Sequence, residues 1–181
     1  MKKKATFLAL FILAVTTLAV CQKDKSQRPS PPAQAQCKFS DGKTVTVDYS
    51  SPRAKGRKIF GGLVPYGQVW RAGANEATTF VTTVDLSVGD KKVPAGSYTL
   101  FVIPNEEKWT LIISKKTGEW GEPYPGEADD FARLDMHVTK VSEVVEDFTI
   151  KVDESSSIAF SGRKGYTGGL SMSWETTRAS V

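Results

Sequence analysis

The chain has 181 residues, of which 40% are hydrophobic and 24% are charged, and its formal net charge is +4. These proportions are typical of a soluble globular protein and exclude global disorder, while the length is too short for a (β/α)₈ barrel of about 250 residues. Three of the cations are Lys2, Lys3 and Lys4, so the rest of the chain has 21 cations against 20 anions. A nearly neutral protein lacks the broad positive field that is typical of nucleic-acid-binding proteins, so we expect no nucleic-acid partner.

The first 21 residues have the pattern of a signal peptide. The lysines precede an uncharged, largely apolar run over residues 5–20, which is typical of an exported protein. A retained transmembrane helix is the weaker alternative, because the run is shorter than the roughly 20 residues needed to cross a bilayer. Leu18-Ala19-Val20-Cys21 resembles a bacterial lipobox, although Val20 stands where that pattern has a small residue. Cleavage near Ala33-Gln34-Ala35, giving a soluble protein, is the alternative.

We therefore expect lipidation at Cys21 and a protein anchored in the cell envelope, on the periplasmic side or at the cell surface. Residues 22–37 are predicted to be a flexible tether, because they include Pro29-Ser30-Pro31-Pro32 and no large apolar side chain. Such a segment buries too little surface to offset its ordering entropy. Residues 38–181 are predicted to form a single β-sandwich domain.

The predicted domain is built from strands. Alternating or β-branched runs of four to eight residues bounded by turn residues are typical of strands, and a helical period is missing apart from one turn near residues 127–131. The runs comprise residues 44–49, 78–84, a hairpin over 86–93, then 96–103, 108–114, 133–141, 148–152, 157–161 and 170–176. This pattern predicts an all-β sandwich or partly open barrel of about nine short, mainly antiparallel strands with little helix.

Several motifs of this region resemble one protein family. The most specific part is residues 51–78, and the resemblance covers roughly Tyr49 to the C-terminus. The motifs are Ser51-Pro52-Arg53, Lys55-Gly56-Arg57, Ile59-Phe60-Gly61, Val64-Pro65-Tyr66-Gly67, Val69-Trp70-Arg71, Gly73-Ala74-Asn75-Glu76-Ala77-Thr78, Pro94-Ala95-Gly96-Ser97-Tyr98-Thr99-Leu100-Phe101, Trp109-Thr110 and Trp120-Gly121. They are similar to the bacterial domain-of-unknown-function family numbered 2911. The resemblance implies an exported, lipoprotein-like, all-β protein and implies no established activity.

Polar and aromatic residues of the same region are the candidates for a ligand site. Arginine side chains suit carboxylate, sulfate or phosphate groups because their planar forks donate paired hydrogen bonds. An aromatic ring in a polar loop can stack on a sugar or an aromatic ligand. The alternatives are a solvated strand face, an ion pair between Arg71 and Glu76, and an aromatic side chain folded onto its own loop. The candidate ligand-binding residues are Arg53, Arg57, Trp70, Arg71, Asn75, Glu76 and Trp120.

The sequence favours binding over catalysis. Asn75-Glu76 resembles the asparagine that precedes the acid–base glutamate in some retaining glycosidases. Glycoside hydrolysis also needs a second positioned carboxylate, which the sequence does not identify. His137 is the only histidine, and we expect it on the exposed face of a strand. One histidine and an ordinary thiol do not make a zinc site, so we expect no metal, no cofactor and no confident catalytic residue. The leading interpretation is a membrane-tethered module for an anionic or carbohydrate-like ligand. A hydrolase using Glu76 and an envelope scaffold protein are the alternatives.

Overall fold

Strands make up most of the protein, as the sequence predicts. The computed structural model describes residues 24–88, 91–121, 123–153, 160–162 and 167–181, so the predictions for the signal peptide and Cys21 lie outside the described residues. The elements are η1 (Lys25–Gln27), β1 (Pro32–Lys38), β2 (Thr44–Ser50), β3 (Thr78–Thr82), β4 (Leu86–Val88), β5 (Lys91–Val93), β6 (Gly96–Ile103), β7 (Lys108–Ser114), η2 (Glu127–Asp129), β8 (Asp130–Asp153), β9 (Phe160–Gly162) and β10 (Thr167–Ser180). Both described helices are single 3₁₀ turns, and neither is long or apolar enough to cross a bilayer.

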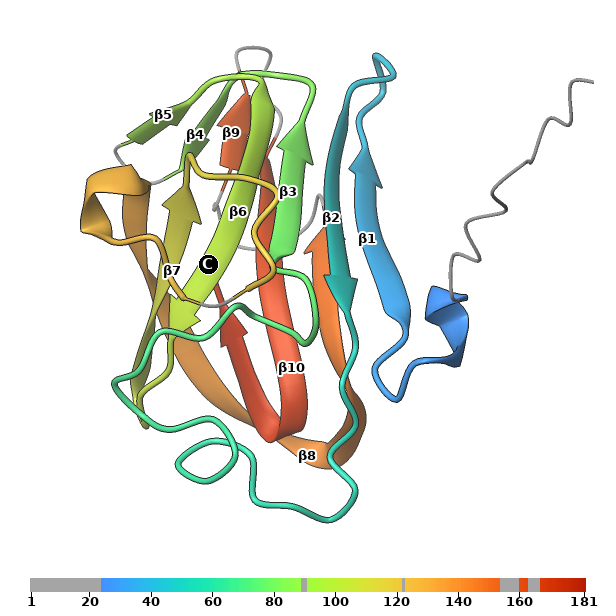
Figure 1. The fold of residues 1–181 in the computed structure, drawn as a ribbon. Helices are drawn as coiled ribbons and strands as arrows, with labels where there is room; N and C mark the ends of the chain where they lie inside the picture. The colour runs from blue at the N-terminus through green and yellow to red at the C-terminus, as the bar shows by residue number, and fades with distance from the viewer. Residues whose placement is uncertain (1–23, 89–90, 122, 154–159, 163–166) are drawn as a thin grey trace, which may run out of the picture.

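The strands form one continuous antiparallel order, β1-β2-β3-β6-β7-β8-β10-β9-β4-β5. The first seven form a sheet that curls into a half-barrel. In Figure 1, β10 lies behind β3 and β6, and β8 curves beneath the lower end of β10. Where β2 ends, the half-barrel closes on the second half of β8, because the Ile150 amide donates to the Tyr49 hydroxyl oxygen at 3.1 Å. The prediction of an all-β sandwich or partly open barrel is therefore confirmed, with the main sheet curled into a half-barrel.

Period-two alternation places apolar side chains inside the half-barrel. Val45 and Val47 of β2 are fully buried, and Val47 lies opposite Phe80 of β3. The central strands β6 and β7 bury side chains on both faces. Their outer face carries a second small cluster, in which Phe101 and Ile112 pack with Tyr124. The loops that follow β2 and β7 cover this outer face.

Strand β1 corrects the predicted tether. Residues 32–37 were assigned to a flexible segment, but they pair with β2 from Pro32↔Ser50 to Lys38↔Thr44. The segment has no large apolar side chain, but its inward-facing residues, Ala35 and Cys37, are both small and both buried. Small side chains can therefore supply the inner face of an edge strand.

Candidate functional site

A long loop crosses the lower end of the half-barrel in Figure 1. This β2–β3 loop, residues 51–77, is held by backbone hydrogen bonds to two other strands. At its start, Ala54 N–H donates to the Glu146 carbonyl at 2.8 Å and Phe148 N–H donates to the Pro52 carbonyl at 2.9 Å. Later, Trp70 and Val102 exchange two bonds of 2.8 Å. These anchors fix the loop over the barrel end.

Aromatic side chains fill the barrel beneath this loop. Trp70 stacks on Trp174 of β10, with ring centroids 5.9 Å apart and an interplanar angle of 18°. Phe60 packs edge-on against Trp109 at 4.6 Å, and Phe148 packs against Trp70 at 5.0 Å. The Trp109 Nε1–H is buried and has no acceptor among the described residues, which is uncommon for a buried donor. The cluster gives the loop a rigid apolar floor.

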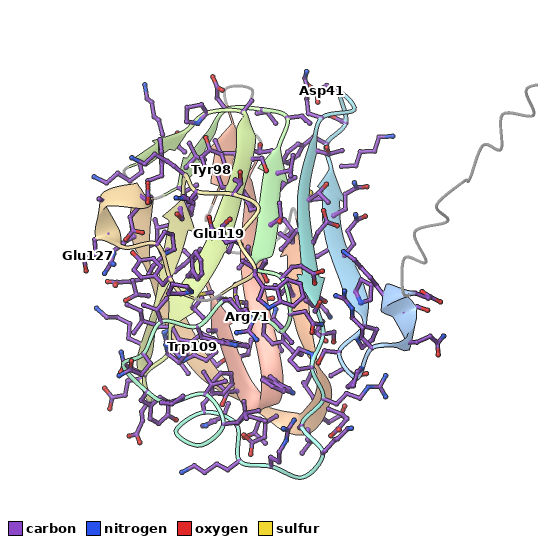
Figure 2. All side chains as sticks on the ribbon, viewed as in Figure 1. Asp41, Arg71, Tyr98, Trp109, Glu119 and Glu127 are labelled. Carbon is purple, nitrogen blue, oxygen red and sulfur yellow. The ribbon has the colours of Figure 1, made fainter. Side chains whose placement is uncertain are left out.

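A pocket of about 510 Å³ is lined mostly by residues of this loop, and it includes Trp70 and Trp174 of the aromatic cluster. Its wall includes Arg57, Trp70 and Arg71 from the loop, Trp174 from β10 and Ser30 from the segment before β1. The structure therefore brings three of the predicted ligand-binding residues to one pocket, and Figure 2 shows Arg71 in this lower part of the molecule.

Arg71 is half-buried, and its Nε atom is buried. The backbone of the loop after β7 lies directly on the Arg71 side chain. A Cβ atom placed on Gly121, whose φ is +106°, would overlap the Arg71 Cδ atom and approach the Asn75 carbonyl oxygen to 2.9 Å. Glycine at position 121 therefore allows this close approach, which holds the Arg71 side chain from one side.

The backbone beyond Arg71 adopts left-handed conformations at residues other than glycine. Ala72 has a φ of +53° and Asn75 a φ of +58°. The buried Thr78 hydroxyl donates to the Ala72 carbonyl at 2.7 Å, and Trp70 Nε1–H donates to the Gly73 carbonyl at 3.0 Å. Such conformations cost of order 1–3 kcal/mol each, and they cluster at ligand sites. The neighbouring side chains thus hold a strained turn at the edge of the pocket.

Asn75 and Glu76 bind the segment that precedes β1. Asn75 Nδ2 donates to the Ser30 carbonyl at 3.0 Å. The Glu76 carboxylate accepts two hydrogen bonds from Arg28 Nη1, at 3.0 and 2.8 Å, and lies 3.0 Å from Lys25 Nζ. Among the described residues, Glu76 thus pairs with Arg28 and Lys25, and the pair considered with Arg71 does not form.

The surroundings of Glu76 lower its pKa. Burial alone would raise the pKa, but the Glu76 backbone N–H and the Arg28 and Lys25 side chains outweigh burial and lower the pKa from 4.5 to about 2. A general acid needs a raised pKa to hold its proton at neutral pH. Glu76 is an ionised, paired carboxylate, so its environment does not favour the hydrolase alternative. Within the described part of the chain, no three His, Cys, Asp or Glu side chains lie close enough to hold a metal ion.

Of the remaining candidates, Arg57 lines the pocket, whereas Arg53 and Trp120 are not among the residues that line it. Arg53 pairs with Asp147 of β8 at 3.3 Å, with both side chains about half exposed. Arg57 donates to the Arg53 carbonyl at 2.6 Å and to the Ala54 carbonyl at 3.0 Å while lining the pocket. Arg53 forms an isolated β-bridge with Asp147, and the chain turns at Lys55 and Gly56, so these residues do not form the solvated strand face that was the alternative. Trp120 is 64% exposed, next to the glycine that covers Arg71.

Two parts of the site were not predicted from the sequence. Leu170, Met172 and Trp174 occupy alternate positions and are all buried. This alternation indicates a core strand and does not indicate that Trp174 lines a pocket. Lys25 and Arg28 lie in the segment assigned to the tether. Their pairing with Glu76 joins positions about 50 residues apart, and no local pattern reports such a contact.

The comparisons with known proteins now bear on this arrangement. Residues 30–181 match the family described as "Protein of unknown function (DUF2911)". The chain belongs to this family. The matched region starts at Ser30, so it includes β1, the whole β2–β3 loop and every pocket residue named above. No curated protein and no solved structure was found to match the chain.

Proposed function

We propose that this protein is an exported, lipid-anchored binding module whose pocket under the β2–β3 loop takes a small anionic or carbohydrate-like ligand. The observation that carries the proposal is the composition of one pocket wall, where Arg57 and Arg71 lie beside the stacked Trp70 and Trp174. The volume of about 510 Å³ falls in the range of roughly 300–1,000 Å³ that is usual for small-molecule sites.

Each side chain supplies a different part of the recognition. A guanidinium has five N–H donors in a planar fork, and Arg57 uses its Nε and one terminal nitrogen on loop carbonyls. Its other terminal nitrogen would bind a carboxylate or phosphate oxygen. The positive charge of Arg71, which also lines the pocket, would attract the same anionic group. The Trp70 ring would contact the apolar face of a sugar or another planar group. This combination favours a ligand with one anionic group and one flat, weakly polar face.

A thermal-shift screen tests this proposal. The purified protein is heated with sugar acids, sugar phosphates and neutral disaccharides at 1 mM each. A ligand present at 100 times its Kd stabilises the folded state by about 2.7 kcal/mol, which corresponds to a rise in Tm of roughly 5–10 °C for a domain of this size.

Matched arginine variants locate the binding. Arg71→Ala and Arg57→Ala should each lose most of the ligand-induced rise in Tm, measured against their own ligand-free baselines. Arg53→Ala is the control, because this side chain pairs with Asp147 and is not among the residues that line the pocket. A panel that shifts no Tm, or a shift that persists in both pocket variants, would contradict the proposal.

A further inference from the structure

The segment before β1 is bound to the barrel by polar contacts. We call residues 24–31 the N-terminal strap. Three contacts with the β2–β3 loop hold it: the Glu76 carboxylate binds Lys25 and Arg28, Asn75 Nδ2 donates to the Ser30 carbonyl, and Ser51 N–H donates to the Pro31 carbonyl at 2.9 Å. The strap is thus attached to the same loop that carries the pocket arginines.

The strap also forms part of the pocket wall. Ser30 is the strap residue that lines the pocket, as do Gly73 and Ala74 of the loop. Asn75, the next residue along the loop, holds Ser30 through its hydrogen bond to the Ser30 carbonyl. Asn75 adopts its left-handed conformation at this point, which directs the turn toward the strap. Removing the strap would therefore open this side of the pocket to solvent.

The strap is held more weakly than the strand that follows it. Its helical turn η1 has no buried residue, and the Lys25 and Arg28 side chains are 60% and 27% exposed. In contrast, β1 pairs with β2 over seven residue positions and buries Ala35 and Cys37. Segments with few buried apolar contacts open at a lower free energy than the core. The strap can therefore leave while β1 stays in the sheet.

We propose that the N-terminal strap is a releasable wall of the pocket, latched by Glu76, and that its release exposes the Trp70–Trp174 pair. Asn75 and Glu76 then act as positioning residues for the wall and make no contact with a ligand. This inference goes beyond the proposed function, because it concerns the opening of the pocket and does not depend on which ligand binds.

Limited proteolysis measures release directly. Trypsin cleaves the Lys25–Ser26 bond only when the strap has left its latched position and can extend in the protease cleft. Glu76→Gln removes the charge that binds both cations and should raise the rate of this cleavage about three- to tenfold. Asp147→Asn is the matched control, because it removes one carboxylate from an exposed ion pair with Arg53. It should leave the rate unchanged.

A second measurement reports the wall itself. In a Trp120→Phe background, which removes the exposed indole, acrylamide should quench the remaining tryptophan fluorescence more strongly in Glu76→Gln than in the parent. Arg28→Gln should reproduce both effects. The exchanged pair Arg28→Glu with Glu76→Arg restores the ion pair at position 28 but not the one with Lys25. It should therefore recover part of the protection lost in Arg28→Gln, which separates loss of the latch from misfolding.

Either of two results would overturn the proposal. Equal cleavage at Lys25–Ser26 in the parent and in both latch variants would show that Glu76 does not hold the strap. Faster cleavage without a change in quenching would show that the strap is not a wall of the pocket. A screen in which no compound shifts the Tm would contradict the proposed function and leave both of these measurements unaffected.

Discussion

The low pKa of Glu76 makes its contribution to stability depend on pH. In the unfolded chain this carboxyl titrates near 4.5, whereas in the folded protein its pKa is about 2. Between these values the unfolded state binds more protons, so the free energy of unfolding falls as the pH falls. The contribution of Glu76 is therefore complete above about pH 4.5, declines through the interval and is absent below about pH 2.

The structure sets the size of this effect. A fall in pKa from 4.5 to about 2 corresponds to a ceiling of about 3.4 kcal/mol at about 1.36 kcal/mol per pKa unit. The Glu76 side chain is 34% exposed and one of its cations is 60% exposed, so solvent screens the pair. Exposed ion pairs contribute about 0–1 kcal/mol, and we therefore expect a contribution of about 1 kcal/mol from Glu76 at neutral pH.

Urea unfolding of the parent and of Glu76→Gln checks this expectation. At pH 7 the variant should be less stable by about 1 kcal/mol, and the difference should shrink to near zero at pH 2. Other carboxyl groups destabilise both proteins equally in acid, so they cancel in the difference. A difference that stays constant from pH 7 to pH 2, or that grows in acid, would refute the reasoning.

Gly121→Ala should lower the free energy of unfolding by about 2–4 kcal/mol, because of backbone strain and overlap with the Arg71 side chain. Gly118→Ala is the control: this glycine has a φ of +78° but open space around it, so the variant should lose only about 1 kcal/mol. In urea unfolding, Trp174→Ala should lower the free energy of unfolding by about 3–5 kcal/mol, whereas Trp120→Ala should change it by less than about 0.5 kcal/mol. Similar losses in the two variants would contradict the burial of Trp174 and the exposure of Trp120. Cys21→Ser should move the protein from the membrane fraction to the soluble exported fraction, and equal membrane retention of the variant would exclude the lipid anchor.

The strands could be predicted from the sequence where their side chains are buried. Strands β6 and β7 agree with their predicted ranges, because apolar residues fill both faces and turn residues bound both ends. Residues 133–141 and 148–152 were predicted as two strands, yet both belong to β8. The stretch between them is mostly exposed, so it carries no burial pattern, although its Val145 pairs with Glu175 of β10. A stretch that pairs through its backbone but buries few side chains leaves no hydrophobic pattern in the sequence.

The site was predictable only where its residues are neighbours in the chain. Trp70 and Arg71 are adjacent, and the loop that carries them also carries Arg57, so their common pocket follows from one segment. The partner of Glu76 could not be chosen from sequence, because Arg71 lies five residues away whereas Arg28 lies 48 residues away. The fold decides between them by pairing β1 with β2, which brings the strap alongside the loop.

The latched strap also limits how far the domain can stand from a membrane. With the proposed anchor at Cys21, the four residue steps to Lys25 reach at most about 14 Å, at about 3.6 Å per step. With the strap released, the first fixed residue is Pro32, and the eleven steps to it reach at most about 40 Å. If Cys21 carries the proposed anchor, the contact between Glu76 and the strap would also set this spacing. A latched domain would lie close to the lipid headgroups, and an opened one would reach up to about 40 Å above them.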